Sequence, residues 1–170
     1  FYSIPYGQFS REIMQPNSGL RNFKPYIKIF TSNISDLGPM SDKKACLENL
    51  ENYINQIKCL NEIEMGWNII FRFYISEQFT SNTKQKEYRY LIDLLNKKLE
   101  ESFVSDENVL LIDLPNEAIS SSKMLLDRRL WYMGKFPFSR EWDDLISDKL
   151  SSFIISIMGK SIRAIILDLD

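Results

Sequence analysis

The sequence contains no histidine among its 170 residues. Serine–histidine and cysteine–histidine catalytic pairs need an imidazole base, and many metal sites use imidazole nitrogens as ligands. The absence therefore excludes both kinds of site from this chain. A basic excess is missing too, because 21 lysines and arginines stand against 23 aspartates and glutamates, a net charge of −2. Proteins that bind phosphate backbones usually carry a clear basic excess, so we expect no nucleic-acid partner.

Long apolar runs are also missing. No segment approaches the roughly 18–20 apolar residues that cross a bilayer. No basic stretch leads into an apolar one, as it does in a secretory signal. We therefore expect no membrane partner and a cytoplasmic location.

Cysteine is scarce, with Cys46 and Cys59 as the two examples. If both lie on one helix, they are about 20 Å apart along its axis at ~1.5 Å per residue. A disulfide needs Cα atoms within about 7 Å of each other, so these two cannot form one there. We expect reduced thiols that fill the core.

What is present fits an ordinary globular domain, with 44% apolar and 26% charged residues and a length that suits one core. Four short segments are rich in β-branched and aromatic residues, and their apolar character is continuous. This is typical of strands that are covered on both faces. The predicted strands are residues 26–31, 68–75, 109–113 and 164–168, with residues 1–4 as a weaker fifth.

Three further segments place apolar residues every three or four positions, which is the spacing of an amphipathic helix. These are residues 41–60, 85–102 and 140–158. Ser41 and Ser139 are predicted to cap the first and the last of them, and Gly159 to end the last. Strands that alternate with helices indicate right-handed βαβ units. We therefore predict an α/β fold with three layers, α/β/α, around a mainly parallel sheet.

Polar residues follow each predicted strand at the carboxyl edge of the sheet, where such sheets bind ligands. They are Ser32 and Asn33, Ser76 and Glu77, Asp113, and finally Asp168 with Asp170. A chain that turns in water also needs polar residues after its strands. For each of these residues taken alone, except Asp168 and Asp170, we favour this simpler explanation.

Two stretches of the sequence resemble one family. The first is YGQFSREIMQPNSGLRNFKP at residues 6–25, and the second is LDRRLWYMGKFPFS at residues 126–139, which a helix joins to GKSIRAIILDLD at residues 159–170. Both resemble FkbH-like proteins of the haloacid dehalogenase (HAD) superfamily, subfamily IIIC. In that family an N-terminal α/β domain related to SGNH hydrolases precedes a HAD domain. The resemblance covers essentially the whole chain, and its second stretch is the more specific.

The resemblance implies two parts. Residues 1–158 match the N-terminal domain, with an SGNH- or flavodoxin-like sheet, and residues 159–170 match the linker and first strand of a truncated HAD domain. An early strand of the family fold is expected before residue 1. Asp168 and Asp170 then match the start of the HAD motif Asp-x-Asp-x-Thr.

Carboxylates two apart in a strand point the same way, roughly 6.5–7 Å apart. Two of them at that spacing can share one Mg²⁺. By the resemblance, Asp168 matches the nucleophile that attacks a phosphoryl group, and Asp170 matches the acid/base that assists the leaving group. The simpler alternative is a solvated end without a ligand. Because the later HAD motifs are absent, we expect this fragment alone not to be a phosphatase.

The family resembles a Mg²⁺-dependent phosphatase and transferase. It takes a three-carbon glyceryl unit from a phosphorylated glycerate and loads it onto an acyl carrier protein, in polyketide-type biosynthesis. Relatives also occur near surface-polysaccharide genes. The implied partners are the chain's own C-terminal HAD domain, the carrier protein and the phosphorylated donor. For this fragment we expect a recognition and scaffold role.

One alternative is a degenerate SGNH-type hydrolase or transferase that uses a serine supplied upstream, although the histidine of that chemistry is missing. Another is a unit that only covers the HAD domain. The loop at residues 127–139 bears on both, because it clusters charged and aromatic side chains: Asp127, Arg128, Arg129, Trp131, Tyr132 and Lys135. Such a set suits a phosphorylated or carboxylated ligand, docking against a second domain, which we favour, or plain packing. Carrier proteins are usually acidic, so a face that binds one should be basic, and the candidates are Arg128, Arg129, Lys135, Lys160 and Arg163.

Overall fold

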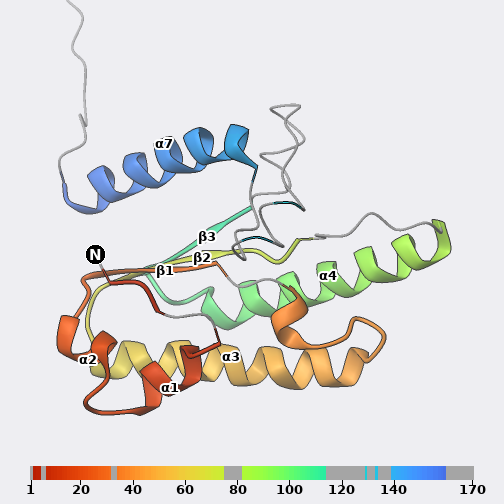
Figure 1. Ribbon diagram of the computed structural model, residues 1–170, viewed down its shortest axis with the longest axis horizontal. Coiled ribbons are helices and arrows are strands. Elements are labelled where there is room, and N and C mark those ends of the chain that lie inside the picture. The colour runs from red at the N-terminus through yellow and green to blue at the C-terminus, as the bar shows by residue number, and fades with distance from the viewer. Residues whose placement is uncertain are drawn as a thin grey trace, which may run out of the picture. The chain divides into compact units, whose positions relative to one another are not determined.

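The computed structural model describes residues 2–4, 7–31, 34–74, 82–113, 129, 133 and 139–159. The chain divides into two compact units, Phe1–Leu114 and Pro115–Asp170. The first unit contains the sheet, and the described part of the second contains the long helix α7 (Arg140–Ile157) (Figure 1). The domain boundary predicted between residues 158 and 159 stays a prediction.

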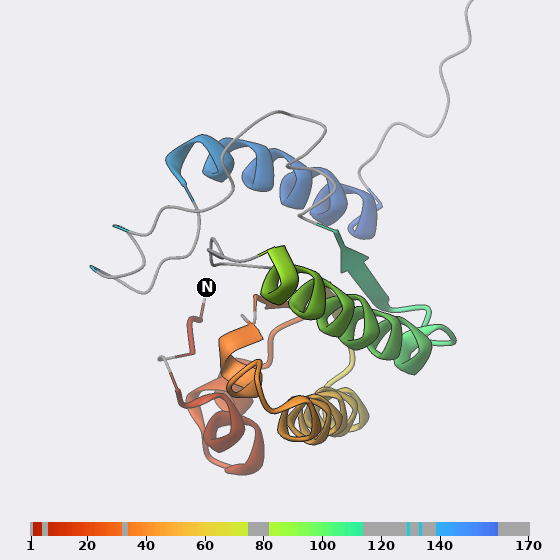
Figure 2. The same cartoon turned by 90° about the vertical axis from the view of Figure 1, so that its right-hand side faces the viewer.

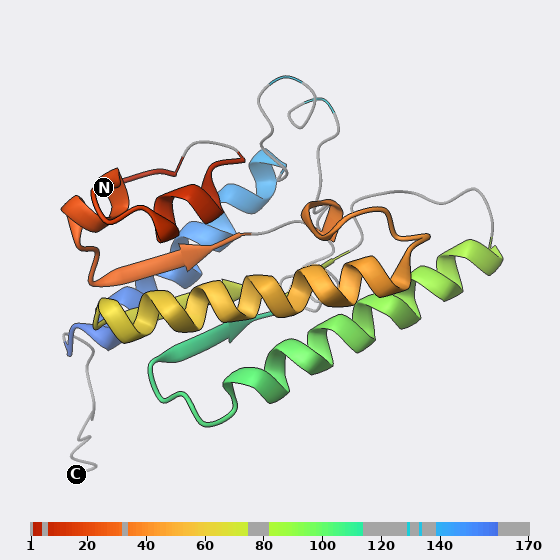
Figure 3. The same cartoon turned by 90° about the horizontal axis from the view of Figure 1, so that it is seen from below.

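A three-stranded parallel sheet organises the first unit, in the order β1 (Ile27–Phe30), β2 (Trp67–Phe71) and β3 (Val109–Ile112). Helix α3 (Lys43–Ile63) connects β1 to β2, and α4 (Asn82–Phe103) connects β2 to β3. Both connections step in the same direction across the sheet. Right-handed crossovers of this kind place their helices on the same face. Figures 2 and 3 show α3 and α4 side by side, and the two helices are in contact.

These elements confirm the α/β class and are consistent with a three-layer α/β/α fold. The three central strand predictions are confirmed to within a few residues. Residues 2–4 carry no strand, so the weaker prediction at residues 1–4 is wrong where the structure describes it. The strand predicted at residues 164–168 lies outside the described residues.

The core lies between the sheet and the two crossover helices. Phe30, Ile70 and Leu111 are in register across the three strands and belong to this core. The helices supply fully buried leucines and isoleucines: Leu50 and Ile57 from α3, and Leu95 and Leu99 from α4. Neighbouring side chains in a strand point to opposite faces. Ile69 and Phe71 therefore lie on the other face, and both are also buried, as the continuous apolar run of β2 predicts.

The predicted caps differ by one residue at α3. Asp42, not Ser41, caps this helix, and its Oδ1 accepts a hydrogen bond from Ala45 N at 3.0 Å. The helix begins at Lys43, so the side chain that reaches the third helical N–H is the one at position 42. Ser139 occupies the capping position of α7, as predicted, but its side chain makes no capping hydrogen bond to the helix. Gly159 follows the end of that helix with a φ of 66°, which suits glycine.

Both cysteines lie on α3 and both are free, as expected. Cys46 is fully buried, and this burial raises the pKa of its thiol. The prediction of a core-filling thiol is wrong for Cys59, which is exposed. Positions 46 and 59 are about 220° apart around a helix of ~3.6 residues per turn, so only one of them can face the core.

Short helices α1 (Phe9–Met14) and α2 (Gly19–Phe23) are held together around Glu12, which is 8% exposed. Its Oε2 accepts hydrogen bonds from Tyr2 Oη at 2.8 Å and from Leu20 N at 3.0 Å. Ser18 caps α2 and also donates to Glu12 O at 2.6 Å. The turn in the stretch 6–25 is thus explained by local hydrogen bonds.

We predict that Glu12→Gln flattens the acid side of the stability profile. The hydrogen bonds from Leu20 N and Tyr2 Oη lower the pKa of Glu12 below its usual 4.5. The stability from a lowered carboxyl pKa is present above about pH 4.5 and is lost as pH falls through the lowered value. Urea unfolding at pH 7, 5 and 3 should therefore show a smaller pH dependence in the variant. The exposed Glu107→Gln serves as control; equal profiles for wild type and Glu12→Gln would contradict the prediction.

Candidate functional site

The carboxyl edge of the sheet is the predicted ligand edge, and the arrowheads of β1 and β3 in Figure 3 point toward it. The short 3₁₀ helix η1 (Ile34–Leu37) also lies there. Of the predicted site residues, the structure describes Asp113, directly after β3, and Arg129, which is exposed. The others lie outside the described residues: Ser32, Asn33, Ser76, Asp127, Arg128, Trp131, Tyr132, Lys135, Asp168 and Asp170.

Asp113 lies beside an arginine that our sequence reasoning missed. Arg72 directly follows β2, and its Nη1 is 2.5 Å from Asp113 Oδ2. Its Nη2 pairs with Glu100 of α4. The side chains of Arg72 and Asp113 are about three-quarters buried, at 24% and 26% exposure. A largely buried cation needs such partners. Arg72, Asp113 and Glu100 therefore join the ends of β2 and β3 to α4. The signal in the sequence was an arginine inside the apolar run NIIFRFYI.

The side chain of Asn96 in α4 makes the backbone hydrogen bonds to Phe73 that a neighbouring strand would otherwise make. Phe73 N donates to Asn96 Oδ1 at 2.8 Å, and Asn96 Nδ2 donates to Phe73 O at 2.9 Å. One side-chain amide thus satisfies both backbone groups of a buried residue, just beyond the end of β2. This contact fixes the path of the chain along the edge.

We predict that Asn96→Ala lowers the free energy of unfolding by about 1–3 kcal/mol, because it leaves the N–H and the C=O of Phe73 without their partner. The matched control is Asn52→Ala, an exposed asparagine inside α3. Urea denaturation of both variants measures the difference. A loss in Asn96→Ala no larger than in the control would show that water replaces the amide at no cost.

Tyr74 is the second residue of the edge that the sequence reasoning missed, and it is 2% exposed. Burial raises the pKa of its hydroxyl, and the nearby Asp36 carboxylate of η1 raises it further. The hydroxyl therefore stays protonated at neutral pH. Tyr74 can donate a hydrogen bond but cannot serve as a general base there.

The described part of this edge is suited to holding the strand ends in place. Arg72 is neutralised by two carboxylates, so it offers little charge to an anionic ligand. Within the described residues, no three histidine, cysteine, aspartate or glutamate side chains are grouped to hold a metal ion. Nor does any helix among them have the length and apolar character to cross a membrane. The chemistry predicted for Asp168 and Asp170 stays a prediction.

Comparison with known proteins supports the fold. No protein-family model and no curated protein matches the chain. It is similar in structure to the N-terminal part of protein BF1531 from Bacteroides fragilis, a crystal structure that contains a phosphatase domain and is complexed with Mg. The TM-score is 0.76 at 19% sequence identity, and the match covers 94% of this chain and 44% of that one. The chain therefore spans less than half of its structural neighbour and shares its α/β fold over nearly its own whole length.

Proposed function

We propose that residues 1–158 form the N-terminal domain of an FkbH-like enzyme, and that residues 159–170 are the linker and first strand of its HAD domain. The observation that carries the proposal is the match of 94% of the chain to 44% of a larger protein chain, one that contains a phosphatase domain and was crystallised with Mg. The stretch WYMGKFPFS followed by GKS and Asp-Leu-Asp agrees with it. Fold and motif thus support the same assignment independently.

In the proposed reaction, a carboxylate oxygen of Asp168 attacks the phosphorus of a phosphorylated glycerate. The P–O bond to a hydroxyl oxygen of the glycerate breaks, Asp170 gives its proton to that departing oxygen, and water then hydrolyses the aspartyl phosphate to inorganic phosphate. The donors fit magnesium, because carboxylate oxygens are the ligands that this hard cation takes in proteins. Mg²⁺, when bound, neutralises charge on the phosphoryl oxygens. Asp168 and Asp170 would hold it together with ligands from the rest of the HAD domain.

The proposed acceptor of the glyceryl unit is the thiol of an acyl carrier protein, in polyketide-type or surface-polysaccharide biosynthesis. After the dephosphorylation, its sulfur attacks the carboxyl carbon of a donor that carries a second phosphate there as an acyl phosphate, the C–S bond forms, and the C–O bond breaks with release of that phosphate. We assign recognition and scaffolding to the domain formed by this chain. The pairing of Arg72 with two carboxylates supports this role over catalysis. So does the lack of histidine, which SGNH-type hydrolysis requires. Among the basic residues proposed to face the carrier, Arg129 is described and is exposed.

The test uses the full-length protein with its HAD domain. It receives a phosphorylated glycerate, Mg²⁺ and a phosphopantetheinylated carrier protein, and the carrier is weighed by intact-mass spectrometry while released phosphate is assayed. We expect a glyceryl-sized mass increase that a chelator removes and added Mg²⁺ restores. Phosphate release without any mass increase would overturn the proposed acceptor and leave a phosphatase. Activity that is insensitive to the chelator would overturn the proposed use of magnesium.

A further inference from the structure

An open pocket of about 620 Å³ lies at the opposite edge of the sheet. Its walls come from the turn after α1, the end of α2 and the end of α3: Pro16, Arg21, Lys24, Pro25, Ile63, Glu64 and Met65. Lys24 and Pro25 lead into β1, and Glu64 and Met65 lead into β2. The pocket is therefore at the amino ends of these strands, away from Arg72 and Asp113. Neither the predicted site nor the proposed reaction uses it.

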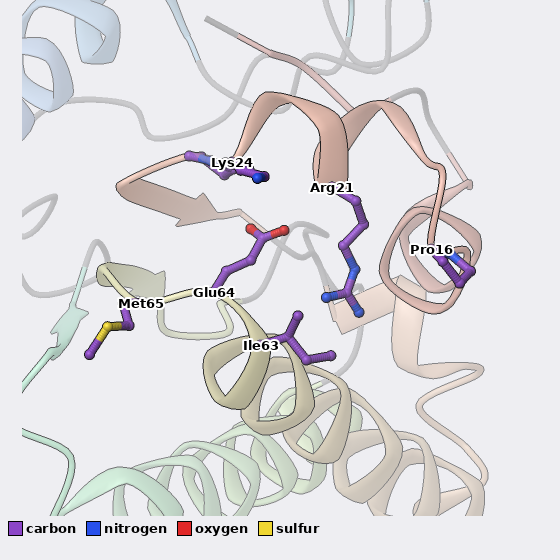
Figure 4. A pocket seen from close by; sticks show the side chains of 7 residues that line it. Pro16, Arg21, Lys24, Ile63, Glu64 and Met65 are labelled. Atoms are coloured by element: carbon purple, nitrogen blue, oxygen red, sulfur yellow. The ribbon is translucent and has the colours of Figure 1, made fainter.

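Three charged side chains converge on this pocket (Figure 4). Arg21 is anchored, because its Nε and Nη2 both donate to Ile13 O, at 3.2 and 2.8 Å. Lys24 is held in the left-handed conformation, with a φ of 50°, at the end of α2. The Glu64 side chain extends toward the space between these two (Figure 4), and its Oε2 is buried without a hydrogen-bond partner among the described residues. The pocket thus offers two cations and one carboxylate, and the buried ammonium of Lys28, which donates to Glu64 O at 3.1 Å, is a charged neighbour of that carboxylate.

Large apolar side chains are exposed in the wall of this pocket and close to it in the sequence. Ile63 and Met65, in its wall, are 56% and 92% exposed. Three more exposed apolar residues lie within two positions of a wall residue in the sequence: Met14 at 75%, Phe23 at 48% and Tyr26 at 60%. Exposed apolar groups that gather around a pocket mark an interaction surface. Methionine and aromatic side chains are enriched at protein interfaces, and methionine adapts to partners of different shape.

We infer that this pocket is a docking site for an acidic, apolar segment of a partner protein. Such a segment supplies each group that the pocket lacks. Its carboxylate complements Lys24 and Arg21, its backbone N–H groups complement Glu64 Oε2, and its apolar side chains cover Met65 and Ile63. A free organic acid would leave the surrounding apolar side chains exposed, so a protein segment accounts for more of the surface.

The test uses the 170-residue chain and two fluorescein-labelled peptides, one alternating aspartate with leucine and one alternating lysine with leucine. Fluorescence anisotropy should show saturable binding of the acidic peptide and at least about tenfold weaker binding of the basic one. Lys24→Asn should weaken the acidic peptide about fivefold, in line with the loss of one rim charge; asparagine tolerates the left-handed conformation, so the fold is kept. Met65→Asp should weaken it further. Lys44→Asn, at an 87% exposed lysine of α3, is the matched control.

Three results would overturn the inference. The first is no saturable binding of the acidic peptide at millimolar concentration. The second is equal binding of both peptides, or an equal loss in Lys24→Asn and Lys44→Asn, either of which would mean unspecific adhesion. The third is self-association in analytical ultracentrifugation that Met65→Asp abolishes, because a second copy of the chain would then be the occupant.

Discussion

Replacing Gly66 with alanine is expected to lower the free energy of unfolding by about 3 kcal/mol or more. Gly66 lies between α3 and β2 with a φ of 140°, a region that other residues rarely adopt. A Cβ there would be 2.2 Å from the backbone oxygen of Tyr26. That oxygen also accepts a hydrogen bond from Trp67 N at 2.8 Å, where β1 and β2 begin to pair. The added methyl group would therefore disturb the hydrogen bond at which the pairing of β1 with β2 begins.

Gly38→Ala is the matched control, because it separates strain from collision. Its φ is 111°, but the nearest atom to its Cβ would be Asn49 Nδ2 at 3.7 Å, an ordinary contact. Urea denaturation should give a much lower midpoint for Gly66→Ala than for Gly38→Ala, with similar slopes. Equal losses in the two variants would show that the strained backbone alone matters. An unchanged midpoint for Gly66→Ala would contradict the described packing of β1 against the turn.

The strands of the sheet were predictable because their apolar runs are continuous and short. The exception is the end of β2, predicted at residue 75 and found at Phe71. Beyond it, the backbone groups of Phe73 bind the side chain of Asn96, where a strand would need a neighbouring strand. Because β3 ends at Ile112, the apolar run at residues 68–75 extends beyond the strand with which β2 pairs. An apolar run in the sequence predicts that a segment is buried. It does not tell whether the backbone of that segment is hydrogen-bonded to a neighbouring strand or to a side-chain amide of a helix.

The sequence allowed us to predict which residues lie at the carboxyl edge of the sheet. It did not allow us to predict which side chains form ion pairs there. Topology alone brings the ends of parallel strands together, which put Asp113 there. The ion pair between Asp113 and Arg72 depends on the register of β2 against β3. The ion pair between Arg72 and Glu100 depends on the rotation of α4 about its axis. Neither quantity is fixed by the spacing of apolar residues. The burial of Tyr74 near Asp36 likewise depends on where the chain places η1.

Asp168→Asn should reduce phosphate release and carrier loading by the full-length enzyme about a thousandfold or more. The amide has a similar shape but cannot form the bond to phosphorus that the proposed reaction needs, and losses of this order follow removal of a nucleophile. Asp148→Asn, at an exposed position of α7, is the matched control and should keep wild-type activity. The thermal midpoints of both variants should stay near that of wild type, which separates lost chemistry from lost fold.

The most direct test of the proposed function is the intact mass of the carrier protein after reaction with wild type and with Asp168→Asn. We expect a glyceryl-sized increase with wild type and with Asp148→Asn, and an unmodified carrier with Asp168→Asn. A carrier that Asp168→Asn loads at the wild-type rate would contradict the account, because Asp168 would then not be the nucleophile and the HAD assignment would lose its chemical basis.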